Sequence, residues 1–180
     1  MKHLETIFSG FGGQGALFAG QLLAYAGMAD GLQVTWIPSY GPEMRGGTAH
    51  CTVIVSEEEI GAPIIRQPGA AVVLNLPSMK KYEPLVKSDG ILVVNESLIE
   101  TRSDRDDIRV LYVPASDIAT ELGNPRMANM VLLGALIEAT GIVDPESILE
   151  QLEEHLSERQ RKWVEPNREA LKRGAERARQ

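Results

Sequence analysis

Phe8-Ser9-Gly10-Phe11-Gly12-Gly13-Gln14-Gly15-Ala16 joins an apolar strand-like segment to an apolar helical segment, residues 16–28. Across this stretch the hydrophobic period changes from roughly two to roughly 3.6 residues. The glycines match the G-x-G-x-x-G spacing, and between a strand and a helix they allow a tight turn whose N–H groups favour anions. The candidate cofactor-binding residues are Gly10, Gly12, Gly13, Gln14 and Gly15.

This spacing has alternative explanations, because glycines can also serve only to pack the helix onto the sheet. A dinucleotide site would also need an acidic residue about 20 residues on, at the end of the second strand. That strand, residues 33–38, runs into Ser39 and Tyr40, and no acid stands there. NAD binding is therefore disfavoured, and the packing role stays open.

The composition limits the classes of partner and site. The 180 residues are 43% hydrophobic, which suits one domain with a proper core. A formal net charge of -7 argues against binding to nucleic acid or an anionic membrane. The single cysteine excludes a disulfide framework and a self-contained iron–sulfur cluster. Because no apolar run is long enough to span a bilayer, we expect a cytoplasmic protein.

A second glycine-rich stretch, residues 39–48, follows the second expected strand. Its oppositely charged Glu43 and Arg45 could clamp a carboxylate or a phosphate. The alternative is a crossover connection whose glycines only turn corners. We expect this loop at the same carboxyl ends of strands as the glycine turn, where open α/β sheets bind their ligands.

The rest of the chain predicts an α/β protein with a three-layer, doubly wound, mostly parallel, Rossmann-like sheet and a helical C-terminal extension. Apolar strands are expected at residues 48–56, 70–76, 91–95 and 109–114, with short helices between apolar strands. His50 and Cys51 must face opposite sides of their strand, and Cys51 is expected to be an inert core residue.

The C-terminal part is expected to be helical. A long helix over residues 126–140, with Asn129 near its start, is followed by a helix over 145–156. We divide the chain into an α/β domain, residues 1–156, and a charged helical tail, residues 157–180. The tail is interpreted as solvated, with an arm that orders on a partner subunit as the alternative.

The pairing of residues 10–15 with residues 39–49, followed by the strand 50–56 and later by Asn124-Pro125-Arg126-Met127-Ala128-Asn129-Met130, resembles the gamma subunit of 2-oxoacid:ferredoxin (acceptor) oxidoreductases. The resemblance covers nearly the whole chain. In length the chain is most similar to a stand-alone gamma subunit, such as that of 2-oxoglutarate:acceptor oxidoreductases.

The resemblance implies a complex that oxidatively decarboxylates a 2-oxoacid, with 2-oxoglutarate favoured, to its acyl-CoA while reducing ferredoxin. It implies thiamine diphosphate, Mg, iron–sulfur clusters and coenzyme A in the complex, with no cofactor held stably, no metal site and no catalytic residue on this chain. The implied partners are alpha and beta subunits and a ferredoxin-like delta subunit. The residues implied to contact partners or coenzyme A are Ser39, Tyr40, Glu43, Met44, Arg45, Gly46, Gly47 and Asn129.

Two other hypotheses remain at this point. One is a free-standing Rossmann-type oxidoreductase that binds NAD or a flavin through the glycine turn. The other is a sensing or structural module that merely shares the fold. The helix over residues 16–28 has an unusually small-residue face, so a homodimer is possible when partners are absent.

Overall fold

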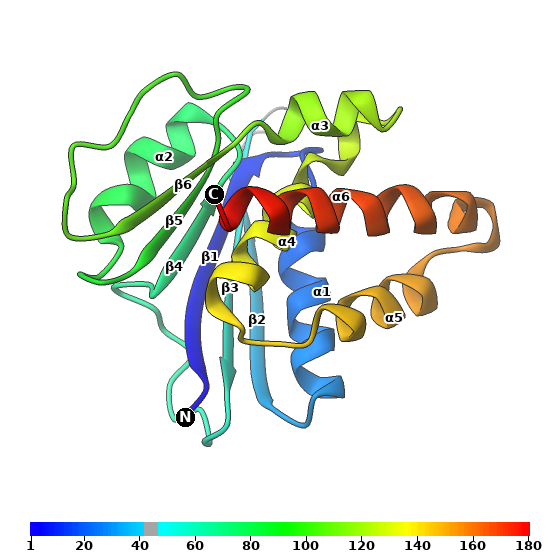
Figure 1. The fold of residues 1–180 in the computed structure, drawn as a ribbon. Coiled ribbons are helices and arrows are strands. Elements are labelled where there is room, and N and C mark those ends of the chain that lie inside the picture. Colours follow the sequence, from blue (N-terminus) through cyan, green and yellow to red (C-terminus); the bar gives the residue numbers. More distant parts are fainter. Residues whose placement is uncertain (42–46) are drawn as a thin grey trace.

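The computed structural model describes residues 1–41 and 47–180, which build a six-stranded sheet flanked by helices (Figure 1). The strand order is β2-β3-β1-β4-β5-β6. The strands are β1 (His3–Phe11), β2 (Gln33–Tyr40), β3 (Thr48–Ser56), β4 (Ala70–Val73), β5 (Ile91–Asn95) and β6 (Arg109–Val113). The predicted strand positions are confirmed, although the apolar run predicted at residues 70–76 is a strand only as far as Val73.

The sheet is mixed. β1, β4, β5 and β6 run parallel, whereas β3 lies antiparallel between β1 and β2. Tyr40 pairs with Ala49, so the connection after β2 is a hairpin and not the crossover weighed above. β2 is an edge strand, a position that tolerates Pro38 because an edge residue need not donate to a neighbour.

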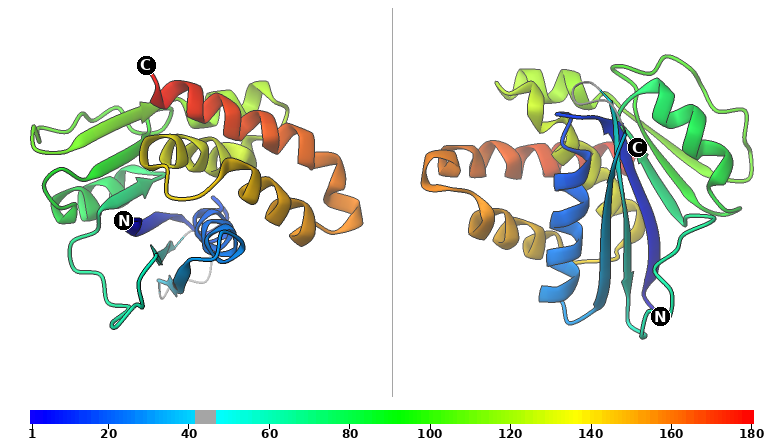
Figure 2. Two further views of the ribbon diagram at one scale, coloured as in Figure 1. Left: turned by 60° about the horizontal axis from the view of Figure 1, so that its bottom comes forward. Right: turned by 180° about the vertical axis from the view of Figure 1, so that it is seen from behind.

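Helices cover both faces, which confirms the three-layer α/β class (Figure 2). α1 and α4 pack on one face, and α2 packs on the other. Neighbouring β1 residues show the division, since Phe8 belongs to the core under α1 and Ile7 to the core under α2. The helices are α1 (Ala16–Ala29), α2 (Leu76–Tyr82), α3 (Ala115–Glu121), α4 (Ala128–Thr140), α5 (Pro145–His155) and α6 (Val164–Ala178), and the short 3₁₀ turns are η1 (Glu83–Leu85), η2 (Pro125–Met127) and η3 (Glu158–Trp163).

The small-residue face of α1 lies against the sheet. A Cβ atom added at Gly20 would overlap Cys51 Sγ and come within 3.2 Å of Phe8 Cδ2. Because these small residues are used inside the chain, the argument for self-association through this face no longer holds.

The interpretation of residues 157–180 as a solvated tail is wrong. α6 packs along α4, and its Ala170, Leu171 and Ala178 are buried in the main core. The helix buries a narrow small-residue stripe while its long charged side chains stay outside, which is why the segment reads as a charge run. The segment is helical, as predicted, but it is part of the folded body (Figure 1).

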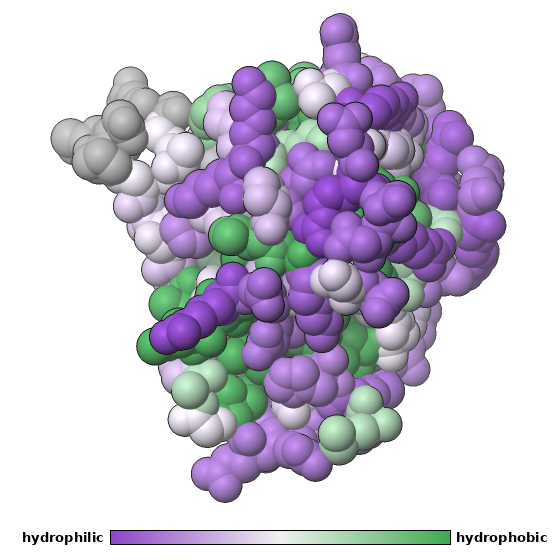
Figure 3. Space-filling view, turned by 90° about the vertical axis from the view of Figure 1, so that its left-hand side faces the viewer, coloured by the Kyte–Doolittle hydropathy of each residue, from purple (hydrophilic) through white to green (hydrophobic). Residues whose placement is uncertain are grey.

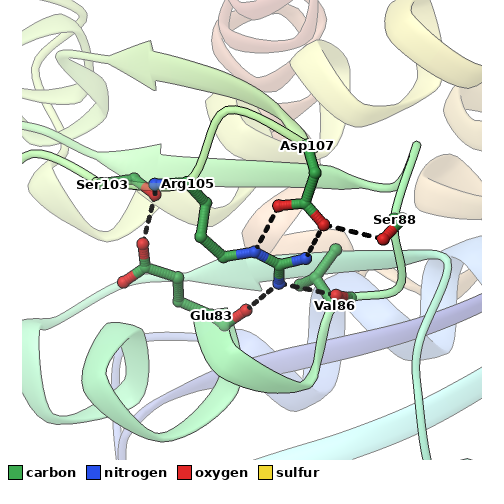
Figure 4. Close-up of polar contacts among 6 residues, drawn as sticks. All are labelled: Glu83, Val86, Ser88, Ser103, Arg105 and Asp107. Atoms are coloured by element: carbon green, nitrogen blue, oxygen red, sulfur yellow. Dashed lines mark hydrogen bonds and ion pairs between the residues drawn. The ribbon is translucent and has the colours of Figure 1, made fainter.

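The connection between β5 and β6 is an extended segment without a helix, contrary to the expected repeat of strand, short helix and strand. The side chain of Arg105 fixes this segment to the two ends of η1, the 3₁₀ turn that follows α2 (Figure 4). Its guanidinium donates to the carbonyl oxygens of Glu83 at 2.8 Å and Val86 at 2.7 Å, and it pairs with both carboxylate oxygens of Asp107. Hydrogen bonds from Arg105 and then Ser88 hold the pKa of Asp107 well below its ordinary range.

The half of the sheet formed by β2 and β3 has a helix, α1, on one face, whereas α2 on the other face contacts β4 and β1. Ile37 on β2 and Ile64 in the connection 57–69 are 44% and 75% exposed. The side of the molecule that carries α2 shows hydrophobic residues grouped among hydrophilic ones (Figure 3).

Candidate functional site

Two loops meet at the carboxyl edge of the central strand β1. The N–H of Gly12, just after β1, donates to the carbonyl oxygen of Gly47 at 2.9 Å. The N–H of Gly41 donates to the carbonyl oxygen of Thr48 at 2.7 Å and closes the β2–β3 hairpin at the same edge. The structure therefore places the glycine turn beside the hairpin, at the edge where the sequence predicted both. The predicted contact residues Glu43, Met44, Arg45 and Gly46 lie outside the described residues.

The glycine turn requires glycine at two positions. Gly13 and Gly15 have φ angles of 94° and 81°, in the left-handed region that L side chains rarely adopt. Around Gly13 the space is open, whereas a Cβ at Gly15 would lie 2.5 Å from Asn129 Nδ2. Gly15 is also the N-cap residue of α1. The turn is thus exposed on its outer side and closely packed on its inner side.

Gln14 ties the turn to the next strand–helix unit. Its Oε1 accepts a hydrogen bond from the backbone N–H of Phe11 at 2.7 Å and another from Asn75 Nδ2 at 3.0 Å. Asn75 is 4% exposed and caps α2 by accepting from the N–H of Ser78 at 2.9 Å. The shape of the turn is therefore linked to the start of α2.

Asn129 supports the turn from the other side. Its Nδ2 donates to the carbonyl oxygen of Gly15 at 3.1 Å, and the residue is 5% exposed. This predicted contact residue lies at the site, but it is buried. It supports the backbone of Gly15 and does not itself form the exposed surface.

The hairpin contributes the outer part of the site. Tyr40 is 74% exposed at the end of β2, and Ser39 is half-buried and paired with His50 of β3. An exposed tyrosine on an ordered strand end offers both apolar area and a hydroxyl to a partner. Ser39, Tyr40 and Gly47 thus form one side of the rim, with the glycine turn as its neighbour.

A small pocket of about 160 Å³ opens beside the turn, along the carboxyl ends of β4 and β5. Asn95 and Ser116 in its wall, and Asn75 next to it, were not identified as site residues from the sequence. The sequence did carry a signal, because Asn75 stands two residues after the buried apolar strand β4 and Asn95 is the last residue of the buried apolar strand β5. The pocket is lined by Gly13, Gln14, Leu74, Asn95, Ser116, Pro125, Arg126 and Ala128.

His50 and Cys51 do not form a reactive pair. Cys51 is fully buried beneath α1, where its thiol lies 3.7 Å from the carbonyl oxygen of Ala16. Burial raises the pKa of Cys51 to about 12, so the thiol stays protonated at neutral pH and is a poor nucleophile. His50 lies beside Tyr82 of α2, with the ring centroids 5.7 Å apart. Burial, and then the charge of Lys81, lower the pKa of His50, so its ring is neutral near pH 7.

Within residues 1–41 and 47–180, no three His, Cys, Asp or Glu side chains are grouped so that they could hold a metal ion. The helices in these residues are also all too short or too polar to cross a bilayer.

The comparison with protein families decides the assignment. A family model described as pyruvate ferredoxin/flavodoxin oxidoreductase matches residues 5–177. The chain belongs to this family. The resemblance drawn from the two glycine-rich motifs is thereby confirmed.

Named relatives in this family act on several 2-oxoacids. The 2-oxoglutarate synthase subunit KorC of Methanocaldococcus jannaschii is 37% identical over 147 residues, which cover 80% of this chain and 79% of the relative. The ketoisovalerate oxidoreductase subunit VorA of Methanothermobacter marburgensis is also 37% identical, over 99% of this chain but only 37% of the relative. The chain thus spans little more than a third of the ketoisovalerate relatives that it matches.

A solved structure supports the gamma-subunit assignment within the family. The chain resembles the crystal structure of a keto/oxoacid ferredoxin oxidoreductase gamma subunit from Geobacter sulfurreducens, with a TM-score of 0.82 and 32% identity. The match covers 97% of this chain and 98% of that subunit. This chain therefore matches a gamma subunit of this family in fold, over nearly the whole length of that subunit.

Proposed function

We propose that this chain is the accessory gamma subunit of a 2-oxoacid:ferredoxin oxidoreductase complex, which converts a 2-oxoacid to its acyl-CoA and reduces ferredoxin. The family match and the likeness to a solved gamma subunit support the proposal. The complex works in the cytoplasm and includes alpha, beta and ferredoxin-like delta subunits.

The observation that carries the proposal is the joined rim at the carboxyl edge of β1. Gly12 and Gly47 are hydrogen-bonded, and Tyr40 is exposed beside them. This rim faces the alpha and beta subunits or coenzyme A. Asn129 acts there by holding Gly15. By resemblance, the contact surface also includes Ser39, Glu43, Met44, Arg45 and Gly46.

The redox and decarboxylation chemistry belongs to the other subunits. An iron–sulfur cluster does not fit this chain, because the only cysteine is buried beneath α1 with a protonated thiol. Thiamine diphosphate and Mg are held by the alpha and beta subunits in this proposal. The role of the gamma subunit is to bind and gate, since the movement of a domain that takes no part in the chemistry can set the turnover rate.

2-Oxoglutarate is the proposed substrate of the complex. The support is the 37% identity to 2-oxoglutarate synthase subunits over most of both chains. The selectivity itself resides in the alpha and beta subunits, so pyruvate and 2-oxoisovalerate are the substrates to compare.

The test is co-expression of the alpha, beta and delta subunits with and without this chain. We expect the complex with the chain to reduce methyl viologen in the presence of 2-oxoglutarate and coenzyme A, and the chain alone to be inactive. Equal rates and equal coenzyme A affinity without the chain would overturn the accessory role. A preference for pyruvate or 2-oxoisovalerate would overturn only the choice of substrate.

A further inference from the structure

The side-chain amide of Gln14 can take only one orientation. Its two partners, the backbone N–H of Phe11 and Asn75 Nδ2, are both donors, so the atom that faces them must be the carbonyl oxygen. The reversed amide would set N–H groups against each other. The Nε2 group of Gln14 is therefore turned away from these donors, and Gln14 forms part of the pocket wall beside the turn.

Ser116 offers a second donor to the same pocket. Its Oγ accepts from Asn95 Nδ2 at 2.9 Å, and its backbone N–H donates to Asn95 Oδ1 at 3.3 Å. Asn95 is 1% exposed and also donates to the carbonyl oxygen of Leu74 at 3.4 Å, so its own position is fixed. Because the Ser116 oxygen is used as an acceptor, its hydroxyl proton is left for a further acceptor.

Arg126 brings a positive charge to the pocket. It is exposed on η2, whose start is fixed by Asn124 accepting the backbone N–H of Arg126 at 3.1 Å. Among the described residues, the ion pairs within 4.0 Å do not involve Arg126. Side chains from the glycine turn, from the first turn of α3 and from η2 thus supply donors to one cavity, and none of the three is acidic.

We propose that the pocket formed by Gln14, Ser116 and Arg126 binds a single oxyanion of the phosphate or carboxylate class. A volume of about 160 Å³ accommodates one such group with a few waters, and not a whole nucleotide. Gln14 holds the turn with its oxygen and the anion with its nitrogen, so the shape of the turn and occupancy of the pocket are coupled. The inference rests on the proposed function only for the physiological source of the anion, a coenzyme phosphate or a 2-oxoacid carboxylate.

The test is a titration of the isolated full chain followed by ¹H–¹⁵N NMR. Inorganic phosphate and 2-oxoglutarate are added separately at constant ionic strength, with sodium chloride as the blank. We expect a saturable shift of the Gln14 side-chain NH₂ signals with at least one of the two anions. Saturation by phosphate assigns the pocket to a phosphate group, and saturation by 2-oxoglutarate assigns it to a carboxylate. Shifts no larger than those caused by chloride would overturn the proposal.

Gln14→Glu separates the two roles of the side chain. The carboxylate still accepts from Phe11 and Asn75, but it replaces the outward NH₂ with a negative oxygen. We expect a native-like spectrum and an anion affinity weakened about tenfold or more, since a charge-assisted donor becomes a repulsive group. The matched control is Gln67→Glu, the same change at an exposed residue outside this pocket. Unchanged affinity in Gln14→Glu would contradict the proposal.

Ser116→Ala provides a second variant should Gln14→Glu fail to fold. It removes one hydroxyl donor and is expected to weaken anion binding severalfold while the spectrum stays native. Unchanged affinity here would also count against the site. Both titrations use the isolated chain. Anion binding can therefore be observed even if the chain has no accessory role in the complex, and the accessory role can be observed even if the pocket binds no anion.

Discussion

Glycine serves opposite purposes in two regions of this chain. In the turn after β1, Gly13 has a left-handed φ and open space around it. Between α4 and α6, an added Cβ at Gly134 would overlap the backbone of Leu171, and one at Gly174 would overlap the carbonyl oxygen of Val131. The first region keeps the backbone reachable from outside, whereas the second brings two helices into direct backbone contact.

The difference separates function from stability. Substitution at a packing glycine must push helices apart, and so it changes the free energy of unfolding. Substitution at the open turn glycine costs only backbone strain, and so it should change binding more than folding.

Gly174→Ala should lower the free energy of unfolding by about 3 kcal/mol or more, because its Cβ meets rigid backbone. Alanine is otherwise the better helix residue by about 1 kcal/mol, so intrinsic helix propensity alone predicts the opposite sign. Urea unfolding followed by circular dichroism measures the difference. Gly61→Ala is the control, since its Cβ would meet no atom within 4 Å. A Gly174→Ala protein as stable as this control would show that α6 does not pack on α4 as described.

Gly20→Ala should destabilise the protein by about 1–3 kcal/mol, because the new methyl group would overlap Cys51 Sγ. Cys51→Ala removes that sulfur, so the double variant should recover part of the loss. A double-mutant cycle measured by urea unfolding should give a favourable coupling of about 1 kcal/mol. Strictly additive effects would mean that α1 and β3 are further apart than described.

Gly13→Ala should cost about 1 kcal/mol of stability, the strain of a left-handed alanine, since nothing obstructs the new methyl group. In the reconstituted complex we expect the KM for coenzyme A to rise. Expressed as a free energy, this change in KM should exceed the change in the free energy of unfolding. If stability fell as far as in Gly174→Ala while KM stayed unchanged, the distinction between the two regions would fail.

The smallest expected effect is the pH dependence of stability that comes from the thiol of Cys51. Its raised folded pKa leaves it protonated from pH 7 to 8, so the unfolding free energy should change by less than about 0.2 kcal/mol through this group. Above its unfolded pKa the unfolded thiol ionises first, so the contribution to stability falls as pH rises toward 12. Thiol labelling at pH 8 should follow the global unfolding rate. Rapid labelling of the native protein would contradict the buried position.

Much of the fold was predictable because its signals are local. Buried apolar strands, the Asp144 cap of α5 and the left-handed Gly141 that ends α4 are each visible in a few consecutive residues. The antiparallel insertion of β3 between β1 and β2 was not predictable, because pairing order depends on residues far apart in sequence. The packing of α6 was also missed, although Ala170, Gly174 and Ala178 repeat a small residue every four positions.

The site was predictable only in part, for a related reason. The glycines of the turn stand in one short stretch, so their spacing could be read directly. Asn95 ends β5 and Ser116 lies in the first turn of α3, and only the parallel strand order brings them beside Gln14. Isolated polar residues after apolar strands are common in α/β proteins, so no local pattern groups these two residues.

The central claim is that the rim of the glycine turn and the β2–β3 hairpin is the surface by which this subunit works in its complex. Hydrogen exchange of the chain, free and assembled with its alpha and beta subunits, tests it most directly. We predict increased protection in peptides covering residues 9–16 and 39–49, with the exposed face of α6 unchanged. Protection concentrated on α5 and α6, with the rim exchanging as in the free chain, would contradict the claim.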